Sequence, residues 1–414
     1  LTTFRQRQAR FRYYDFSRPE IDRYPTADGP VPVALAVREV QPSGIEDPNW
    51  QNLHLRERFV VGNGVVATAA VGRTDEWGPE PYLSGLPLEQ SEGAPEGLDL
   101  RQASIFFPSE VQAYAVLNPT DSSFLAPDGS PGVSGEDYPE GISTGGVTRK
   151  LALAWHLQEA NLLFAGEVNP ESRLVLHRGI RERVERIAPF LRFPESPYPV
   201  IQDGRVLWVM EGFTATRYFP LARPFDLEFR RPVAYVRNSV KVTVDAVTGA
   251  VDLYAGPVDD PLLDGWRSAY PGLFKSLEEM PSGLRQHLRY PRSLLDLQSR
   301  VLLQYHQESP SVFFLQEEAW ALSQERAQGT TSVAYLPEYA LLQLPGDSVP
   351  YFQVNTVFVP AGRQNLTGLL SGRVDDRGRP RLRLLDFPIS QELPGPGQVE
   401  AFIEQNPEIS EQFS

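Results

Sequence analysis

The sequence predicts an α+β fold with antiparallel sheets, grouped helices and long loops rich in proline and glycine. Strand-like runs follow one another without a helix between each pair, unlike the strict βα alternation of parallel sheets. Two segments show the alternation and the turn residues of β-hairpins. Proline occupies 38 of the 414 positions, about twice its usual 5% share, and its missing N–H interrupts regular elements. These observations favour sheets and ordered loops over a helical bundle.

We divide the chain into three regions. Residues 1–160 form a β-rich region with two long loops, residues 161–260 a helix with two hairpins, and residues 261–414 a helical segment followed by strands and a short final helix. The first 25 residues combine six arginines with several aromatic residues. This pattern predicts a basic amphipathic helix, which either lies on a membrane surface or packs its aromatic rings on the core.

The rest of the first region alternates strands with long loops. Strands are predicted at Val31–Glu39 and Phe59–Ala70, the second interrupted by the turn signal Gly62-Asn63-Gly64. Residues 73–100 and 118–147 lack any periodicity, and loops of such length are often functional or disordered. Shorter segments between and after these loops are predicted to be regular: strands at Ala103–Phe107 and Val111–Leu117, and a helix over residues 148–163.

The second region carries the clearest periodic patterns. Apolar residues recur at helical spacing over residues 178–191 and predict a helix. A hairpin is predicted next, with Tyr198–Gln202 and Arg205–Glu211 joined by Asp203-Gly204, a pair that type I′ turns favour. A second hairpin pairs Tyr235–Asp245 with Ala250–Tyr254. Its first strand alternates apolar with polar residues, and we expect the polar face to be exposed: Val240, Val242 and Val244 against Lys241, Thr243 and Asp245.

The third region begins with a helical segment over residues 281–306 that breaks at Pro291. Strands are predicted at Ser332–Leu344, Tyr351–Val359 and Arg381–Phe387, and a short final helix at Gln398–Gln405.

Composition excludes several classes of function. The 39 basic residues are outnumbered by 53 acidic ones, giving a net charge of −14, and such a surface repels nucleic acids. Cysteine is absent, which excludes disulfides, thiolate metal ligands and cysteine nucleophiles. Apolar runs are shorter than the roughly 18 to 20 residues that cross a bilayer. Because the chain begins with Leu1, we expect it to be a processed or trimmed piece.

Motifs for catalysis and cofactor binding are poorly represented. The five histidines lie more than four residues apart, at His54, His156, His177, His287 and His306, whereas zinc sites favour close, regular spacing. The string Gly141-Ile142-Ser143-Thr144-Gly145 matches the nucleophile elbow, but loop residues precede it where a strand is needed. Neither a phosphate-binding loop nor a dinucleotide fingerprint is present. We therefore assign no catalytic, cofactor-binding or metal-binding residues and expect no cofactor.

Acidic residues leave one catalytic class open. Asp245 and Asp252 lie on opposite arms of the second hairpin, followed by Asp259 and Asp260. Paired carboxylates serve glycoside cleavage, and three or four can hold calcium, but an exposed polar face explains the same residues. Glu317-Glu318 indicate a helix face and Asp375-Asp376 a turn. The sequon Asn365-Leu366-Thr367 matters only in a secreted eukaryotic protein.

Several stretches from about residue 30 onward match a known protein family in the same order, among them Arg178-Gly179-Ile180-Arg181-Glu182-Arg183-Val184, Ile187-Ala188-Pro189-Phe190-Leu191, Asp203-Gly204-Arg205, Tyr235-Val236-Arg237-Asn238-Ser239-Val240-Lys241-Val242, Pro271-Gly272-Leu273-Phe274 and His287-Leu288-Arg289-Tyr290-Pro291. On these stretches the chain resembles uncharacterised protein family 0182. It implies a bacterial multi-pass membrane protein in which hydrophobic helices precede a large soluble region outside the cytoplasm. This chain resembles that region alone, and the family has no established activity.

The chain departs from the family pattern at three places. Val61 stands where the family shows the histidine of a Thr-His-Gly motif. An acidic family segment aligns either with Ser123-Phe124-Leu125-Ala126-Pro127, which lacks its carboxylates, or with Glu136-Asp137-Tyr138-Pro139, which keeps them. The family pattern has Asp-Ala-Tyr-Thr where this chain has Glu211-Gly212-Phe213-Thr214, so the carboxylate is retained.

Three functions remain open. The first is a non-catalytic extracytoplasmic domain in the cell envelope, which binds an envelope protein or polymer and acts with its own upstream transmembrane helices. The second is a hydrolase that cleaves an envelope polymer through acidic residues such as Glu211 or Asp245. The third is a domain stabilised by calcium at Asp245, Asp252, Asp259 and Asp260.

Overall fold

A computed structural model describes residues 2–7, 11–71, 81–110, 112–118, 139–225, 232–307, 309–315, 318–326, 332–387 and 392–406. The chain forms two compact units. The first consists of Leu1–Thr214 and Ser239–His287, and the second of Ala215–Asn238 and Leu288–Ser414. The division of the sequence at residues 160 and 260 stays a prediction. Within both units helices accompany antiparallel sheets, which confirms the predicted α+β class.

One sheet of the first unit is built around a long strand, β3 (Gly29–Val40). Its path runs β1-β3-β5-β6-β7, and β2 also pairs with β3. The other strands are β1 (Tyr14–Phe16), β2 (Glu20–Thr26), β5 (Val65–Ala69), β6 (Pro81–Ser84) and β7 (Glu89–Gln90). Val33, Leu35 and Val37 are fully buried because alternate residues of a strand face the same side.

Two predictions for this region are wrong. The amphipathic helix expected over residues 1–25 is limited to α1 (Thr2–Arg7), and β1 and β2 follow it. Pairing with β3 explains the difference, since the whole length of β2 is hydrogen-bonded to that strand and tertiary pairing overrides local preference. The loop predicted over 73–100 contains the β6–β7 pair. Most of the loop predicted over 118–147 lies outside the described residues.

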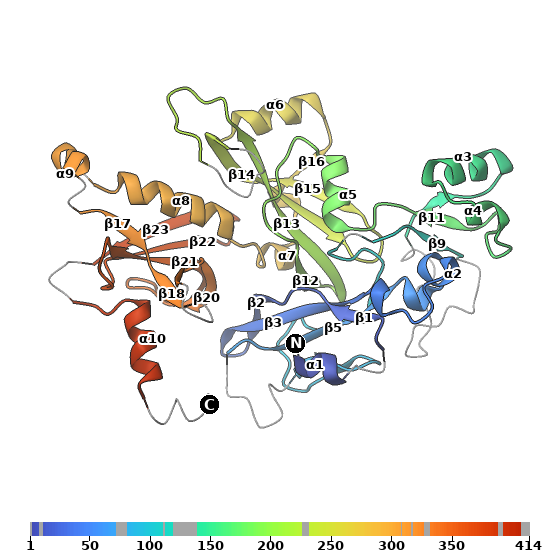
Figure 1. Cartoon of the computed structure of the whole chain (residues 1–414), viewed down its shortest axis with the longest axis horizontal. Helices are drawn as coiled ribbons and strands as arrows, with labels where there is room; N and C mark the ends of the chain where they lie inside the picture. The colour runs from blue at the N-terminus through green and yellow to red at the C-terminus, as the bar shows by residue number, and fades with distance from the viewer. Residues whose placement is uncertain are drawn as a thin grey trace. The chain divides into compact units, whose positions relative to one another are not determined.

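A second sheet runs β12-β13-β14-β15-β16. Its strands are β12 (Tyr198–Gln202), β13 (Arg205–Thr216), β14 (Tyr235–Asp245), β15 (Val251–Ala255) and β16 (Phe274–Ser276). Both predicted hairpins are confirmed. Asp203 and Gly204 have φ values of 52° and 78°, as a type I′ turn requires. Figure 1 shows β2 and β3 next to β12 within this unit.

The polar face of β14 is buried at Lys241 and Thr243 and only partly exposed at Asp245, which corrects one expectation. Lys241 and Thr243 were expected on an exposed polar face, but both side chains are buried. The valines of β14 enter a core shared by the two sheets and by α5 (Ile180–Ile187). On the opposite side of β14, Lys241 forms an ion pair with Glu211, and the hydroxyl of Ser239 donates a hydrogen bond to Asp260.

Arg178 precedes α5 and is itself buried. Its guanidinium donates hydrogen bonds to the carbonyl oxygens of Phe106, Ala113 and Val60. Burial lowers the pKa of Arg178 to about 10, because desolvation disfavours the charged form. The arginine therefore acts as a connector between three segments of the first unit.

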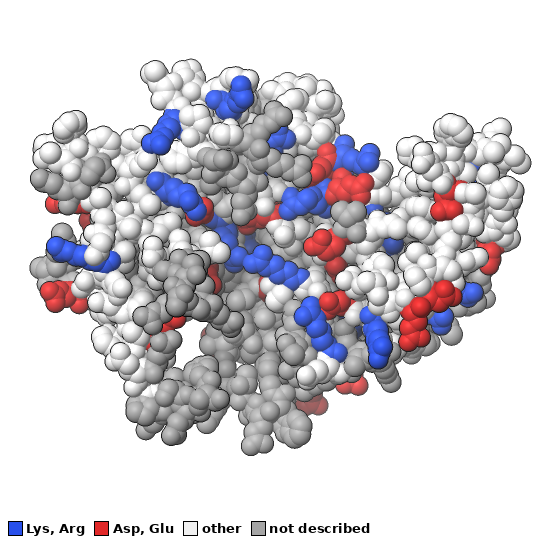
Figure 2. Space-filling view, in the orientation of Figure 1, with Lys and Arg blue, Asp and Glu red and all other residues white. Residues whose placement is uncertain are grey.

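A smaller sheet of the first unit, ordered β10-β11-β9, carries a helical pair. Its strands are β9 (Ala115–Leu117), β10 (Ile142–Ser143) and β11 (Arg173–Val175). The helix predicted over 148–163 is divided into α3 (Val147–Leu157) and α4 (Asn161–Phe164). One face of α3 contacts the core of this subregion, while Leu151 and Trp155 are exposed. Figure 2 shows few charged atoms over these helices.

Further short elements complete the first unit. They are β4 (Gly62–Asn63), β8 (Ser104–Ile105), α2 (Trp50–His54), α6 (Pro261–Ala269) and α7 (Ser282–Arg285), with 3₁₀ turns at Pro42–Gly44, Glu57–Phe59 and Leu277–Glu279.

The second unit packs α8 (Arg292–Tyr305) on a sheet ordered β17-β21-β22-β23, with β20 also paired to β21. The predicted break at Pro291 is confirmed, since this residue precedes α8. Pro337 divides the strand predicted at 332–344, and β22 was not predicted. The remaining elements are α9 (Pro310–Leu315), β17 (Trp320–Leu322), β18 (Gln324–Arg326), β19 (Ser332–Ala334), β20 (Glu338–Leu342), β21 (Tyr351–Pro360), β22 (Gly368–Val374), β23 (Pro380–Asp386) and α10 (Pro396–Glu404).

Candidate functional site

Glu211, a candidate acid from the sequence, forms a buried ion pair. It lies on β13, and the Nζ atom of Lys241 on the neighbouring β14 donates a hydrogen bond to Glu211 Oε2. The two residues are 3% and 4% exposed. The hydroxyl of Tyr198 lies 3.5 Å from Glu211 Oε1 and 3.4 Å from the carbonyl oxygen of His287. The structure therefore places Glu211 in an interior polar cluster.

His287 forms a second buried contact of this cluster. Its Nδ1 atom lies 2.9 Å from Asp22 Oδ2, and both residues are buried. The ring of Tyr24 packs on the imidazole with 4.9 Å between centroids. Because Asp22 and Tyr24 belong to β2 and His287 follows α7, this contact joins the N-terminal sheet to a segment more than 250 residues later.

The four aspartates proposed as calcium ligands have different surroundings. Asp245 accepts backbone N–H groups of the hairpin turn and forms an ion pair with Arg205. Asp252 forms an ion pair with Lys275, and Asp259 is exposed. Asp260 caps α6 and accepts hydrogen bonds from the hydroxyls of Thr214 and Ser239, each at 2.5 Å. Within the described ranges, no group of three or more His, Cys, Asp or Glu side chains could hold a metal ion.

Ser143 does not occupy a nucleophile elbow. It lies on β10, which pairs with β11, and its hydroxyl accepts the N–H of Gly145.

The histidines are distributed over several elements. His54 stacks on Tyr114, His177 contacts Glu182, His306 stacks on Trp320, and His156 is exposed on α3.

The remaining sequence signals have structural positions or lie outside the described residues. Asp375 accepts N–H groups in the predicted turn. Val61 is buried, and its carbonyl oxygen accepts a hydrogen bond from Tyr14. Glu318 lies in a turn, not on a helix face, whereas Glu317 is outside the described residues, as are both alternative acidic alignments apart from Pro139.

Glu39 is a buried carboxylate that the sequence did not single out. It lies on β3 and is 7% exposed. Desolvation raises its pKa to about 7, although hydrogen bonds from the N–H and the hydroxyl of Ser109 act in the opposite direction. Glu110 adds a repulsion that also raises this pKa. The group therefore changes charge near neutral pH.

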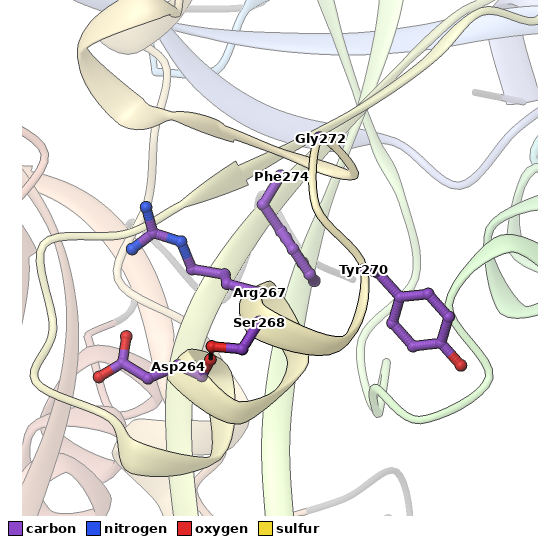
Figure 3. Close-up of a pocket in the computed structure, with 6 residues that line it drawn as sticks. All are labelled: Asp264, Arg267, Ser268, Tyr270, Gly272 and Phe274. Carbon is purple, nitrogen blue, oxygen red and sulfur yellow. Dashed lines mark hydrogen bonds between the residues drawn. The ribbon is translucent and has the colours of Figure 1, made fainter.

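A polar recess lies beside α6. It has a volume of about 470 Å³ and is lined by Asp264, Arg267, Ser268, Tyr270, Gly272 and Phe274. The three helical residues follow i, i+3 and i+4 spacing, which places them on one face of α6. In Figure 3, Asp264 and Arg267 project from the same side of the helix, and Phe274 is seen between Arg267 and Tyr270. Asp264, Arg267 and Tyr270 are exposed.

Unlike the buried carboxylates, the polar groups of this recess are exposed and available to a ligand. Within the described part of the chain, neither the Asp264 carboxylate, the Arg267 guanidinium nor the Tyr270 hydroxyl has an assigned intramolecular hydrogen bond or ion pair. The Ser268 hydroxyl donates a hydrogen bond of 2.9 Å to the Asp264 carbonyl oxygen. The recess thus offers a ligand the N–H donors of a guanidinium group and the acceptor oxygens of a carboxylate.

An aromatic stack of Phe190, Trp266 and Tyr270 lies next to the recess. The rings of Phe190 and Trp266 stack with centroids 4.2 Å apart, and Phe190 and Tyr270 lie nearly parallel at 5.5 Å. Phe190 also packs against the main core of the first unit. Tyr270 is 48% exposed, so a ring held by its neighbours remains accessible at the edge of the recess.

The sequence contained a signal for this site. Asp260-Pro261 combines an N-cap residue with proline at the first helical position, the usual start of a helix. We instead assign Asp260 either to a calcium site or to an exposed polar face, so α6 and the residues on it are not predicted.

The fold and these clusters define an α+β protein of two compact units, with interior carboxylates in polar clusters and an open polar recess. The chain belongs to an uncharacterised protein family, UPF0182, whose model matches residues 1–414. This finding confirms the family resemblance found in the sequence.

Several relatives carry the same family name. The UPF0182 protein of Cupriavidus necator is 35% identical over 422 residues, that of Moorella thermoacetica 34% over 421, and that of Bradyrhizobium diazoefficiens 33% over 416. Each alignment covers 100% of this chain but only 44–45% of the relative. The chain therefore spans about half the length of the curated relatives it matches. No solved structure matches it. None of the helices that the structure describes is long and apolar enough to cross a bilayer.

Proposed function

We propose that this chain is a non-catalytic, water-exposed binding module of a longer bacterial membrane protein, located on the extracytoplasmic face of the cell membrane. Its ligand binds in the recess beside α6. The sequence resemblance supports the membrane context, and the greater length of the relatives leaves room for a membrane part. The partners we propose are the transmembrane helices of the same protein and an envelope protein or polymer.

The main support for this proposal is that the polar groups in the recess are exposed and available to a ligand. Ligand sites combine a concave surface with a few polar groups that fix the orientation of the ligand. Asp264, Arg267 and Tyr270 provide such groups at the surface, next to aromatic rings. By contrast, Glu211 is paired with Lys241 in the interior, and Asp245 holds a hairpin turn. The groups on which the alternative hydrolase depends thus have structural partners, so we favour binding over hydrolysis.

Site-specific photo-crosslinking tests the binding surface. The photoreactive residue p-benzoylphenylalanine replaces Tyr270 in the full-length protein, which is produced in bacterial cells and irradiated. We expect a discrete adduct. The matched control carries the same replacement at Tyr305, which is exposed on α8 of the second unit. Failure to form an adduct at Tyr270, or equal adducts at both positions, would contradict the proposal.

The absence of cysteine makes the location testable as well. Gly166 is exposed, and an added Cβ atom would meet no atom within 4 Å. A Gly166→Cys variant, in a full-length protein without other cysteines, therefore provides one reactive thiol in this chain. We expect a membrane-impermeant maleimide to label it in intact cells. Labelling that appears only after the cells are permeabilised would place the module in the cytoplasm and refute this part of the proposal.

A further inference from the structure

We infer that the loop between β13 and β14 inserts into the surface of a lipid bilayer that carries anionic headgroups. The segment concerned, residues 217–223, is called the tip loop. Its apolar side chains enter the interfacial layer of the bilayer, and its arginines contact the headgroups. The inference goes beyond the proposed function, because it concerns a second surface and a different kind of partner.

Three large apolar side chains are exposed in the tip loop. Tyr218 is 77% exposed, Phe219 50% and Leu221 108%. Figure 1 shows the connection projecting past the ends of both strands. The ring of Phe219 stacks on Tyr235 of β14, with 5.6 Å between centroids, and this contact supports the base of the loop. The apolar side chains are therefore held at the surface, where a partner can cover them.

Leu221 has a backbone conformation that leucine rarely adopts. Its φ is 61°, and the N–H of Ala222 donates a hydrogen bond of 3.3 Å to the Phe219 carbonyl oxygen. Pro220 and Leu221 are thus the central residues of a β-turn, and glycine or asparagine is usual at the second central position when φ is positive. Leucine is strained there and gains no burial within its own chain. A partner that covers its side chain accounts for leucine at this position.

The charge of the tip loop suits an anionic surface. Arg217 and Arg223 are exposed, and residues 215–225 contain no acidic residue. The entire connection, residues 217–234, has four arginines against two acidic residues, a net charge of +2 in a chain whose net charge is −14. Basic residues close to a membrane are attracted to anionic lipids. The local charge therefore directs this loop to the bilayer, whereas the chain as a whole is repelled by it.

The size and chemistry of the tip loop favour a bilayer over a protein partner. At about 200 Å² for each large side chain, the exposed fractions of Tyr218, Phe219 and Leu221 correspond to roughly 470 Å². A stable protein interface takes about 800 Å² from each partner, and a second copy of the chain would place the same arginines against one another. Interfacial anchors combine aromatic and aliphatic side chains with basic residues. The tip loop has this combination.

Co-sedimentation of the complete 414-residue chain with lipid vesicles tests the inference. One preparation contains phosphatidylcholine alone, and the other an equal mixture of phosphatidylcholine and phosphatidylglycerol. We expect an affinity for the mixed vesicles that is at least about tenfold higher than for phosphatidylcholine. This affinity should fall at 1 M salt, where the Debye length is about 3 Å instead of about 10 Å at 0.1 M. Absence of binding to the mixed vesicles at 0.1 M salt would overturn the inference.

Substitutions at Leu221 separate binding from folding. Leu221→Asn suits the positive φ but removes the apolar side chain, so we expect an unfolding temperature no lower than that of the wild type. Its affinity for the mixed vesicles should fall about tenfold or more, equivalent to about 1.4 kcal/mol. Leu221→Met keeps an apolar side chain and should bind within about threefold of the wild type.

The matched control for Leu221→Asn is Trp155→Ala, because Trp155 is 87% exposed on α3. We expect this variant to bind vesicles like the wild type. Unchanged binding of Leu221→Asn, or an equal loss in Trp155→Ala, would show that the bilayer contacts another surface.

Arg223→Gln tests the contribution of charge. We expect its affinity for the mixed vesicles to fall about fivefold and its affinity for phosphatidylcholine to stay unchanged. Arg149→Gln removes the same charge from an exposed position on α3 and should have no effect. Equal losses in the two variants would mean that only the net charge matters, which is incompatible with a local contact.

Two other partners predict different results. If the tip loop binds a second copy of this chain, analytical ultracentrifugation shows a dimer that Leu221→Asn dissociates, and the vesicles do not bind. If it binds an envelope protein, p-benzoylphenylalanine at Leu221 in the full-length protein forms a protein adduct in cells, again without vesicle binding. Either result overturns the lipid inference. The recess is tested separately by crosslinking at Tyr270, so failure of one proposal is distinguishable from failure of the other.

Discussion

Replacement of the buried Glu39 by glutamine is expected to change the pH dependence of stability. In the folded state the pKa of this carboxyl is raised from its usual 4.5 to about 7, chiefly because the group is buried. In the unfolded chain the group is solvated and returns to its usual range. Between pH 4.5 and 7 the folded protein therefore binds a proton that the unfolded chain has released.

The sign and size of the effect follow from linkage. Because the folded state binds more protons in this window, the free energy of unfolding falls as pH rises from 4.5 to 7. The contribution of Glu39 is fully favourable below pH 4.5 and is lost above pH 7. A pKa difference of about 2.5 units corresponds to about 3 kcal/mol, at 1.36 kcal/mol per unit.

Glutamine matches the protonated carboxyl in shape. Its oxygen can accept the N–H of Ser109, and its amide group can donate to the Ser109 hydroxyl, so both existing contacts are kept. We expect Glu39→Gln to have nearly wild-type stability at pH 4.5 and to be about 3 kcal/mol more stable than the wild type at pH 8.

Urea denaturation of both proteins at several pH values measures this difference. Other titrating groups contribute to both proteins and cancel in the comparison. Glu89→Gln is the matched control, because Glu89 lies on the exposed strand β7. A difference between Glu39→Gln and wild type that stays constant from pH 4.5 to 8 would refute the reasoning.

Two further predictions compare matched substitutions by chemical denaturation. Gly249→Ala is expected to destabilise the protein by more than about 1 kcal/mol, since φ is 74° and the new Cβ would lie 2.3 Å from the Phe107 ring. Gly265→Ala on α6 meets no atom within 4 Å and is expected to stabilise by up to about 1 kcal/mol; equal effects of the two changes would contradict this account. Trp208→Ala removes a fully buried ring that hydrogen-bonds to the Phe107 carbonyl and is expected to cost about 3–5 kcal/mol. Trp155→Ala affects a ring that is 87% exposed and should change stability by no more than about 0.5 kcal/mol; a larger loss than at Trp208 would overturn the assigned burial.

Local signals explain which parts of the fold could be predicted. The hairpin at Asp203-Gly204 and the break before α8 at Pro291 depend on residues within a few positions of each other, and both predictions are confirmed. β2 depends on pairing with β3, and of its residues only Pro25 locally disfavours the amphipathic helix. β22 was missed because its buried residues acquire a strand environment only between β21 and β23.

Less of the candidate sites than of the fold could be predicted from local sequence. Glu211 was identified as a candidate acid, but its partner Lys241 lies thirty residues later, and the pairing of β13 with β14 brings them together. The helix beside the recess could have been predicted, because Asp260-Pro261 is a start signal for α6 that is present in the sequence. Its contact with Phe190, by contrast, depends on tertiary packing.

The ion pair between Glu211 and Lys241 also selects the alignment of two neighbouring strands. Successive side chains of a strand point to opposite faces, so a shift of β14 by one residue would turn Lys241 away from Glu211. Each charge would then be enclosed without its counterion, and separating a buried pair costs about 3–5 kcal/mol. The native alignment satisfies both charges, whereas an alignment shifted by one residue satisfies neither. This pair thus disfavours a one-residue misalignment of β13 and β14 during folding, whatever it adds to the stability of the native sheet.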